Sequence, residues 1–131
     1  MDVMTKAAAK QAESDNSAEL RGFFGIAEKW GLSTDEQIRL LGAPARSTFF
    51  KWKKDGGTLS QDTRERISHL ASIYRCLRIL LTEDALAHGW IRRENAAPMF
   101  AGKSALEFMM ATGSIVEIYK VRAYLDAQRG G

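Results

Sequence analysis

The chain has 131 residues, of which 45% are hydrophobic and 27% charged, with a formal net charge of +3 and a pI near 9.2. These values are normal for a soluble globular protein, and the length suits one compact domain or two small domains that share a core. No apolar run approaches the roughly 18 residues that a membrane helix requires, so a membrane-spanning protein is excluded.

The cysteine content and the N-terminus indicate the compartment. Ala7–Ala9 is too short for the apolar part of a signal peptide and is flanked by Lys6 and Lys10. Cys76 is the single cysteine, which excludes a disulfide framework and fits a reducing cytoplasm. We therefore expect a cytoplasmic protein, and the basic pI permits a nucleic-acid partner.

The first residues differ in character from those that follow. Residues 1–15 are polar and rich in alanine, without an apolar stripe, and we expect a disordered arm there. From Asn16 the apolar residues recur with helical spacing, which predicts a helix that ends at Trp30, before Gly31. This helix is expected to pack behind the two short helices that come next.

Residues 34–54 predict a pair of short helices joined by a turn. Ser33 and Glu36 have the spacing of a capping box, which opens the first helix. Gly42 is its natural end because glycine tolerates a left-handed backbone, and Pro44 fits the first turn of the second helix. The turn is about one residue longer than the tightest helix-turn-helix turns, which leaves the angle between the helices open.

The second helix is apolar on one face and basic on another. Ala45, Phe49 and Trp52 share the apolar face. Five basic and two acidic side chains give residues 34–54 a charge of +3, and the basic ones concentrate on this helix. A plain helical hairpin with solvated lysines is the alternative, but this placement of charge favours a helix-turn-helix DNA-binding domain over residues 16–60. The residues expected to contact DNA are Arg46, Ser47, Thr48, Lys51, Lys53 and Lys54.

The rest of the chain, residues 61–131, predicts four further helices. Apolar residues repeat with helical period over residues 61–81, a helix about 31 Å long, on which Asp62 can pair with Arg66. A shorter helix is expected over residues 82–93, followed by a loop over 94–103. Ser104 with Glu107, and Ser114 with Glu117, predict capping boxes for the last two helices. Because no stretch alternates with period two, the fold class is predicted to be all-α.

The sequence offers little for catalysis. Gly102-Lys103-Ser104 has the last three letters of a phosphate-binding loop, but Ala97 stands where the motif needs glycine. His69, His88 and Cys76 occupy single helical positions without metal-ligand spacing. A buried structural thiol is favoured over a nucleophile for Cys76. We therefore predict no enzyme activity, no cofactor and no metal.

The C-terminal Arg129-Gly130-Gly131 is unusual on physical grounds. Two glycines after a helix give a flexible backbone without side chains that carries the terminal carboxylate. A frayed end is the simple interpretation. The alternative is a tail that enters a narrow slot on a partner, with a reach of only about 10 Å.

Several segments together carry a family resemblance over residues 20–131: 40–42, 46–52, 59–60, 66–68, 73–74, 90–93, 100–106, 121–126 and the final Arg129-Gly130-Gly131. With these segments the chain resembles the antitoxins of the Xre/MbcA/ParS family, the partners of RES-domain toxins in type II toxin–antitoxin systems. The C-terminal half is the specific part of the match. Glu94 departs from the family, which usually has proline before Asn95.

The resemblance implies two roles. An N-terminal, Xre-like helix-turn-helix would bind promoter DNA as a homodimer and repress the operon of the antitoxin itself. A long helix would join it to a C-terminal helical domain over residues 61–131, which binds the RES toxin and inserts the tail into its NAD-using active site. The residues assigned to toxin binding on this basis are Trp90, Phe100, Gly102, Ser104, Arg122, Tyr124, Asp126, Arg129, Gly130 and Gly131.

Two other interpretations remain open. The chain could be a stand-alone helix-turn-helix transcription regulator whose C-terminal helices dimerise or sense a ligand. An enzyme that uses Cys76 is a third possibility, which a fully active Cys76→Ser variant would exclude.

Overall fold

The computed structural model describes residues 3–130, with side chains described from Ser17 onward. Within this range the chain forms seven α-helices, one 3-10 helix and no strand, which confirms the all-α prediction. No helix in the described range is both long and apolar enough to cross a membrane. The elements are α1 (Val3–Trp30), α2 (Thr34–Leu40), α3 (Arg46–Asp55), α4 (Gln61–Leu80), α5 (Asp84–Gly89), η1 (Trp90–Arg92), α6 (Ala105–Met110) and α7 (Ile115–Gln128).

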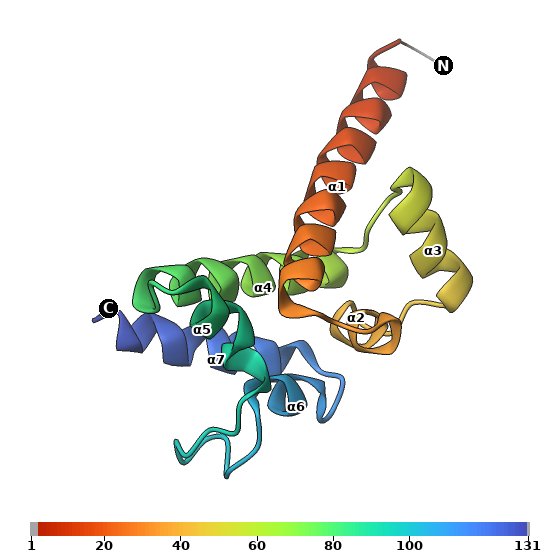
Figure 1. The fold of residues 1–131 in the computed structure, drawn as a ribbon. Helices are drawn as coiled ribbons and strands as arrows, with labels where there is room; N and C mark the ends of the chain where they lie inside the picture. Colours follow the sequence, from red (N-terminus) through yellow and green to blue (C-terminus); the bar gives the residue numbers. More distant parts are fainter. Residues whose placement is uncertain (1–2, 131) are drawn as a thin grey trace.

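Helix α4 lies at the centre of the arrangement (Figure 1). Its most extensive contacts are with α7 and α1. Helices α2 and α3 lie to one side of it, and α5, α6 and α7 lie to the other. Contacts from Arg66 to Gly113 and from Cys76 to Asp126 show that α4 and α7 run parallel. The last turns of both helices therefore lie on the same side of the molecule, where the chain ends (Figure 1).

The N-terminal segment differs from its prediction. The backbone of α1 is helical from Val3, where a disordered arm was expected over residues 1–15. Residues 1–2 lie outside the described range. The helical backbone has a local reason, because residues 3–21 contain neither glycine nor proline and include the strong helix former alanine.

The helix-turn-helix is formed largely as predicted. The Ser33 hydroxyl accepts from the Glu36 N–H at 3.1 Å and the Glu36 carboxylate accepts from the Ser33 N–H at 2.8 Å, which confirms the first capping box. Gly42 has a left-handed φ of +96° and ends α2. The prediction for Pro44 was wrong: α3 begins at Arg46, so the proline precedes the helix. Ala43, in the linker between the two helices, is also left-handed, with φ of +60°.

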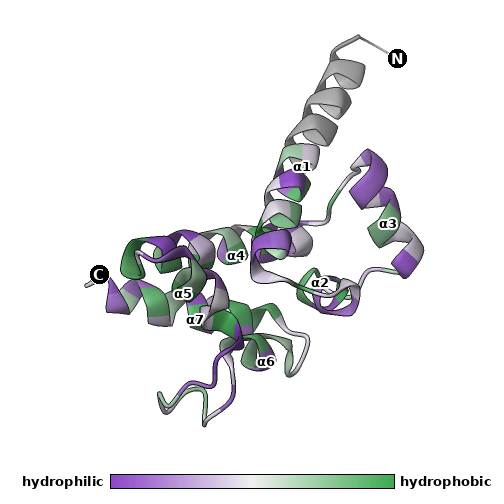
Figure 2. Cartoon of the chain, in the orientation of Figure 1, coloured by the Kyte–Doolittle hydropathy of each residue, from purple (hydrophilic) through white to green (hydrophobic). Residues whose placement is uncertain are grey.

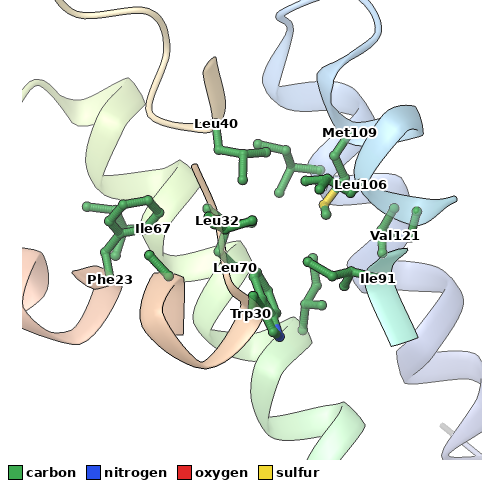
Figure 3. Close-up of a cluster of buried hydrophobic side chains, with 14 of the residues drawn as sticks. Phe23, Trp30, Leu32, Leu40, Ile67, Leu70, Ile91, Leu106, Met109 and Val121 are labelled. Atoms are coloured by element: carbon green, nitrogen blue, oxygen red, sulfur yellow. The ribbon is translucent and has the colours of Figure 1, made fainter. Parts of the chain in front are cut away.

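Both ends of the chain share one hydrophobic core (Figure 3). Leu32 and Leu40 from the helix-turn-helix side face Ile91, Leu106 and Val121 from the C-terminal side, and all five are buried. Figure 2 shows that apolar residues are also concentrated where the C-terminal helices meet one another. The two halves therefore fold as one packed unit.

Of the two capping boxes predicted in the C-terminal half, one is present and one is incomplete. Ser104 and Glu107 form the expected capping box. Ser114 caps α7 by accepting from the Val116 N–H at 3.1 Å, but the Glu117 carboxylate accepts from the Thr112 hydroxyl at 2.8 Å and does not reach back to Ser114. The predicted helix over residues 82–93 is present as α5 followed by η1.

Candidate functional site

The first candidate surface is the outer face of α3. Arg46, Ser47, Lys51, Lys53 and Lys54 are exposed on this helix and Thr48 is half-buried. Phe49 is 0% exposed and fixes the opposite side in the core. Ala45, expected on the same apolar face, is exposed at the N-cap position of α3, where it makes no side-chain capping hydrogen bond. The predicted DNA-contacting residues therefore reach solvent together on one short helix.

Arg46 is held in place at the start of α3. Its Nη1 lies 2.6 Å from Asp35 Oδ1, and its guanidinium lies 5.8 Å from the centre of the Phe50 ring. Phe50 is 46% exposed beside it. An exposed ion pair of this kind contributes little to stability, so its main effect is to orient Arg46 at the surface. Phe50 was not predicted as part of this surface.

Helix α1 adds a further basic residue to the same region. Arg21 lines a hollow of about 270 Å³ between α1 and α3, together with Lys53, Lys54 and Asp55. Gly56 lies tight against α1, because a Cβ on it would collide with Ser17 Oγ. Arg21 was missed in the sequence because it lies 32 positions before Lys53 and no local pattern links the two.

The second candidate surface is the end of α7, where the tail leaves the folded chain. Helix α7 ends at Gln128. The Arg129 N–H donates to Leu125 O at 3.1 Å, and the Gly130 N–H donates to Ala127 O at 3.0 Å. Gly130 has a φ of +90°, a backbone conformation that favours glycine. Arg129 and Gly130 are exposed, and Gly131 lies outside the described residues.

Cys76 connects α4 to the last turns of α7. Its Sγ donates to Asp126 Oδ1 at 3.2 Å and accepts from Arg129 Nη1 at 3.8 Å. Burial, followed by the hydrogen bond with Asp126, raises the pKa of the Cys76 thiol. A raised pKa disfavours the thiolate that a nucleophile needs. These contacts give Cys76 a structural role, as the sequence suggested.

Three aromatic residues assigned to toxin binding form one cluster. The Trp90 and Tyr124 rings stack with centroids 6.5 Å apart, and both contact the Phe100 ring edge-to-face, at 6.1 Å and 5.4 Å. Phe100 is 1% exposed, so a direct contact with a partner is not available to it. Trp90 and Tyr124 are half-buried. Phe100 therefore supports the cluster, and the other two rings form its accessible part.

The other residues assigned to toxin binding also include both buried and exposed side chains. Ser104 is 3% exposed and is occupied in capping α6. Gly102 is exposed, with a φ of +84°, in the loop between η1 and α6. Arg122 is half-buried and donates from Nη1 to His69 Nδ1 at 3.0 Å. Asp126 is half-buried and bound to Cys76. The assigned residues thus do not form a single exposed surface.

Comparison with known proteins also divides the chain into an N-terminal and a C-terminal part, with other bounds than the predicted 16–60 and 61–131. A family model described as an antitoxin Xre-like helix-turn-helix domain matches residues 12–72. A second, described as the antitoxin Xre/MbcA/ParS C-terminal toxin-binding domain, matches residues 76–131. The chain is also 60% identical over 114 residues to an uncharacterized protein, y4oB, of Sinorhizobium fredii, covering 87% of this chain and 86% of that protein. The two matched ranges meet within α4.

Proposed function

Because the chain belongs to the Xre/MbcA/ParS-type antitoxins, we propose that it inhibits a cognate RES-domain toxin with its C-terminal tail and represses its own operon through α2 and α3. The chain carries a helix-turn-helix domain and a toxin-binding domain. In the proposed function both domains act by binding, and the chain catalyses no reaction of its own.

The observation that carries the inhibitory part is the exposure of Arg129 and Gly130 beyond the end of α7. A backbone without side chains can enter a slot that is closed to ordinary residues. In the active site of an NAD-using toxin, the guanidinium of Arg129, once released from Cys76 Sγ, and the terminal carboxylate would occupy the positions of charged groups of the dinucleotide. Inhibition would then be competition for the cofactor site.

The repressor part is supported by the basic outer face of α3. A homodimer would present two such helices to successive major grooves of the promoter. Arg46, Lys51 and Lys54 would contact phosphates or base edges from this face, and Arg21 would add a contact from α1. Phosphate contacts would supply most of the affinity, and base contacts the sequence preference.

The test of the inhibitory part is an extension of the chain by several bulky residues after Gly131. The extended protein is expected to lose neutralisation of the toxin, because a bulky segment cannot follow the glycines into the slot. Its binding to promoter DNA should remain at the wild-type level. Persistent neutralisation by the extended protein would show that the tail does not act inside the active site.

A stand-alone transcription regulator that senses a ligand is the second candidate. One observation favours it: a groove of about 500 Å³ lies between α1 and α4, lined by Phe23, Ile26, Ile67 and Ala71 with the Glu19–Arg64 ion pair at its edge. This volume lies in the range of small-molecule sites. A toxin gene beside this one would favour the antitoxin, and a metabolic operon would favour the regulator.

A further inference from the structure

An apolar hollow of about 220 Å³ lies beside the point where the tail leaves α7. We call it the tail-side hollow. Two of its lining residues, Leu77 and Leu125, are fully buried and form its floor, whereas Leu80, Trp90 and Tyr124 are partly exposed. The residues that line it are Leu77, Leu80, Leu81, Trp90, Tyr124, Leu125 and Gln128.

Exposed apolar side chains gather at the same end of the molecule. Ile79, Leu80 and Leu86 are 57%, 36% and 44% exposed, at the end of α4 and in α5. Figure 2 shows the strong apolar colour at this end of α4, close to the chain terminus. Single exposed apolar residues are ordinary, but a group of them near a concave site is typical of an interaction surface. Of these three residues, Leu80 lines the hollow itself.

The walls of the tail-side hollow are fixed in advance. The Trp90 and Tyr124 rings are stacked with 21° between their planes. Both rest on the buried Phe100 ring. Because the Trp90 and Tyr124 rings already hold their positions, these walls lose little conformational freedom when a side chain of a partner enters. Such a pocket suits an anchor side chain.

The volume of the tail-side hollow indicates what kind of group it can hold. Small-molecule sites typically measure about 300–1,000 Å³, so the tail-side hollow is too small for a cofactor-sized molecule and suits one large side chain. All of its lining residues fall within residues 76–131, the range matched to the toxin-binding domain. Its position next to Gln128 makes it continuous with the surface from which the tail departs.

We propose that the tail-side hollow receives one large aliphatic or aromatic side chain of the toxin, so that the toxin is held at two points, the hollow and the tail. This inference rests on the proposed function and adds to it a second attachment site with its own residues. Anchoring at the hollow keeps the short tail at high local concentration near the active site. Binding and inhibition are therefore separable: the hollow supplies affinity, and the tail supplies inhibition.

The test compares full-length variants by calorimetric titration with the purified RES-domain toxin. Replacing Leu80 by serine removes an apolar wall, and the dissociation constant is expected to rise by about 30-fold or more, as for an anchor contact. Leu80→Met keeps the apolar wall and should change it by less than about threefold. Val116→Ser, at a 48%-exposed position in the first turn of α7, is the matched control and should bind like the wild type.

A second variant distinguishes loss of the binding site from loss of the fold. Gln128→Trp places a bulky ring at the exposed edge of the hollow without removing a core contact, and it should weaken toxin binding in the same way. Thermal unfolding of each variant checks that the fold is retained. The protein extended after Gly131 should still bind the toxin through the hollow, although it no longer inhibits it.

The possible results separate the two proposals. If Leu80→Ser and Gln128→Trp bind the toxin as tightly as the wild type, the tail-side hollow is not an attachment site. If the wild type does not bind the toxin at all, the proposed function itself fails. Loss of binding in both variants, with Val116→Ser unchanged, supports the two-point arrangement.

Discussion

The guanidinium of Arg92 binds the carboxylate of Glu36 across the two halves of the molecule. Its Nη2 lies 2.7 Å from Glu36 Oε1 and its Nη1 lies 3.2 Å from Oε2. The same guanidinium donates to Gly31 O at 2.6 Å and to Trp30 O at 3.3 Å. Since Glu36 also caps α2 through Ser33, one residue of the toxin-binding domain fixes both the end of α1 and the start of the helix-turn-helix.

Two arginines of the helix-turn-helix domain donate in turn to carbonyl groups of the toxin-binding domain. Arg39 of α2 donates from Nε to Met110 O at 2.9 Å. Arg66 of α4, which is 6% exposed, donates from Nη2 to Gly113 O at 2.8 Å and is paired with Asp62. The segment between α6 and α7 is therefore held from the helix-turn-helix side, and contacts in both directions connect α1, α2 and α4 with the C-terminal domain.

Replacing Arg92 by alanine should destabilise the chain by about 1–3 kcal/mol, because the Gly31 and Trp30 carbonyls and the Glu36 carboxylate lose their partner. Urea unfolding measures this loss. Arg92→Lys should restore only part of it, since an ammonium cannot reproduce the planar fork.

Arg75→Ala is the matched control for this change. Arg75 is exposed and donates to Ser72 of its own helix, so its removal should have little effect on unfolding. Equal stability of Arg92→Ala and Arg75→Ala would mean that the connection between the domains contributes nothing to folding.

The Gly42→Ala substitution tests the turn between α2 and α3. Gly42 has a φ of +96°, and a Cβ there would lie 3.2 Å from both Arg66 Nε and Asp62 Oδ2. Strain in the left-handed region costs about 1–2 kcal/mol, and crowding of the ion pair adds to it. The free energy of unfolding should fall by at least that amount.

Gly25→Ala is the comparison for the Gly42 variant. Gly25 is exposed in α1, and a Cβ added to it would meet no other part of the described chain within 4 Å. Alanine in a helix interior is more favourable than glycine by about 0.5–1 kcal/mol, so this variant should be slightly more stable than the wild type. Destabilisation by both alanines to the same degree would contradict the argument from backbone strain.

The elements that could be predicted from the sequence are those whose cause is local. The capping box of Ser33 with Glu36, and that of Ser104 with Glu107, involve residues three positions apart and appear as expected. The long helix was predicted to run over residues 61–81 and α4 spans Gln61–Leu80, because its apolar repeat is continuous over the length of the helix. The acidic partner of Arg66 was also predicted correctly.

The features that could not be predicted depend on contacts between distant residues. Arg92 and Glu36 are 56 positions apart, and nothing in either local sequence indicates that they meet. The sequence indicated the pairing of Arg66 with Asp62 but not the burial of Arg66, which arises because the segment that contains Gly113 packs over it. Phe100 and Ser104 were assigned to toxin binding by resemblance, and their burial became visible only once α6 and α7 were in place.

The pH dependence of stability should carry a contribution from His69. Its Nδ1 accepts from Arg122 at 3.0 Å, and its ring contacts Tyr119 edge-to-face at 5.6 Å. Burial, followed by the charge of Arg122, lowers the pKa of His69 below its usual 6.5, and Glu65 opposes this shift. Since the folded state favours neutral histidine, the contribution is complete above pH 6.5 and is lost as the pH falls through the lower folded value.

Two measurements check this contribution. An NMR titration of the His69 ring should give a midpoint below 6.5. Urea unfolding from about pH 7.5 to about pH 5.5 should show a smaller loss of stability for His69→Gln than for the wild type. Parallel pH profiles for the two proteins would remove His69 as a source of the dependence.

The salt dependence of DNA binding tests the basic face of α3 directly. If Lys51 and Lys54 contact phosphates, each alanine substitution should weaken binding to the promoter duplex and reduce the slope of log K against log salt by about 1, because one counterion fewer is released. Lys120→Ala, on the exposed side of α7, is the charge-matched control and should leave the slope unchanged.

Arg21→Ala should behave like the Lys51 and Lys54 variants if the hollow between α1 and α3 faces the DNA backbone. An identical reduction in all four variants would indicate a general effect of net charge, whereas a reduction in the first two alone would confine the interface to α3.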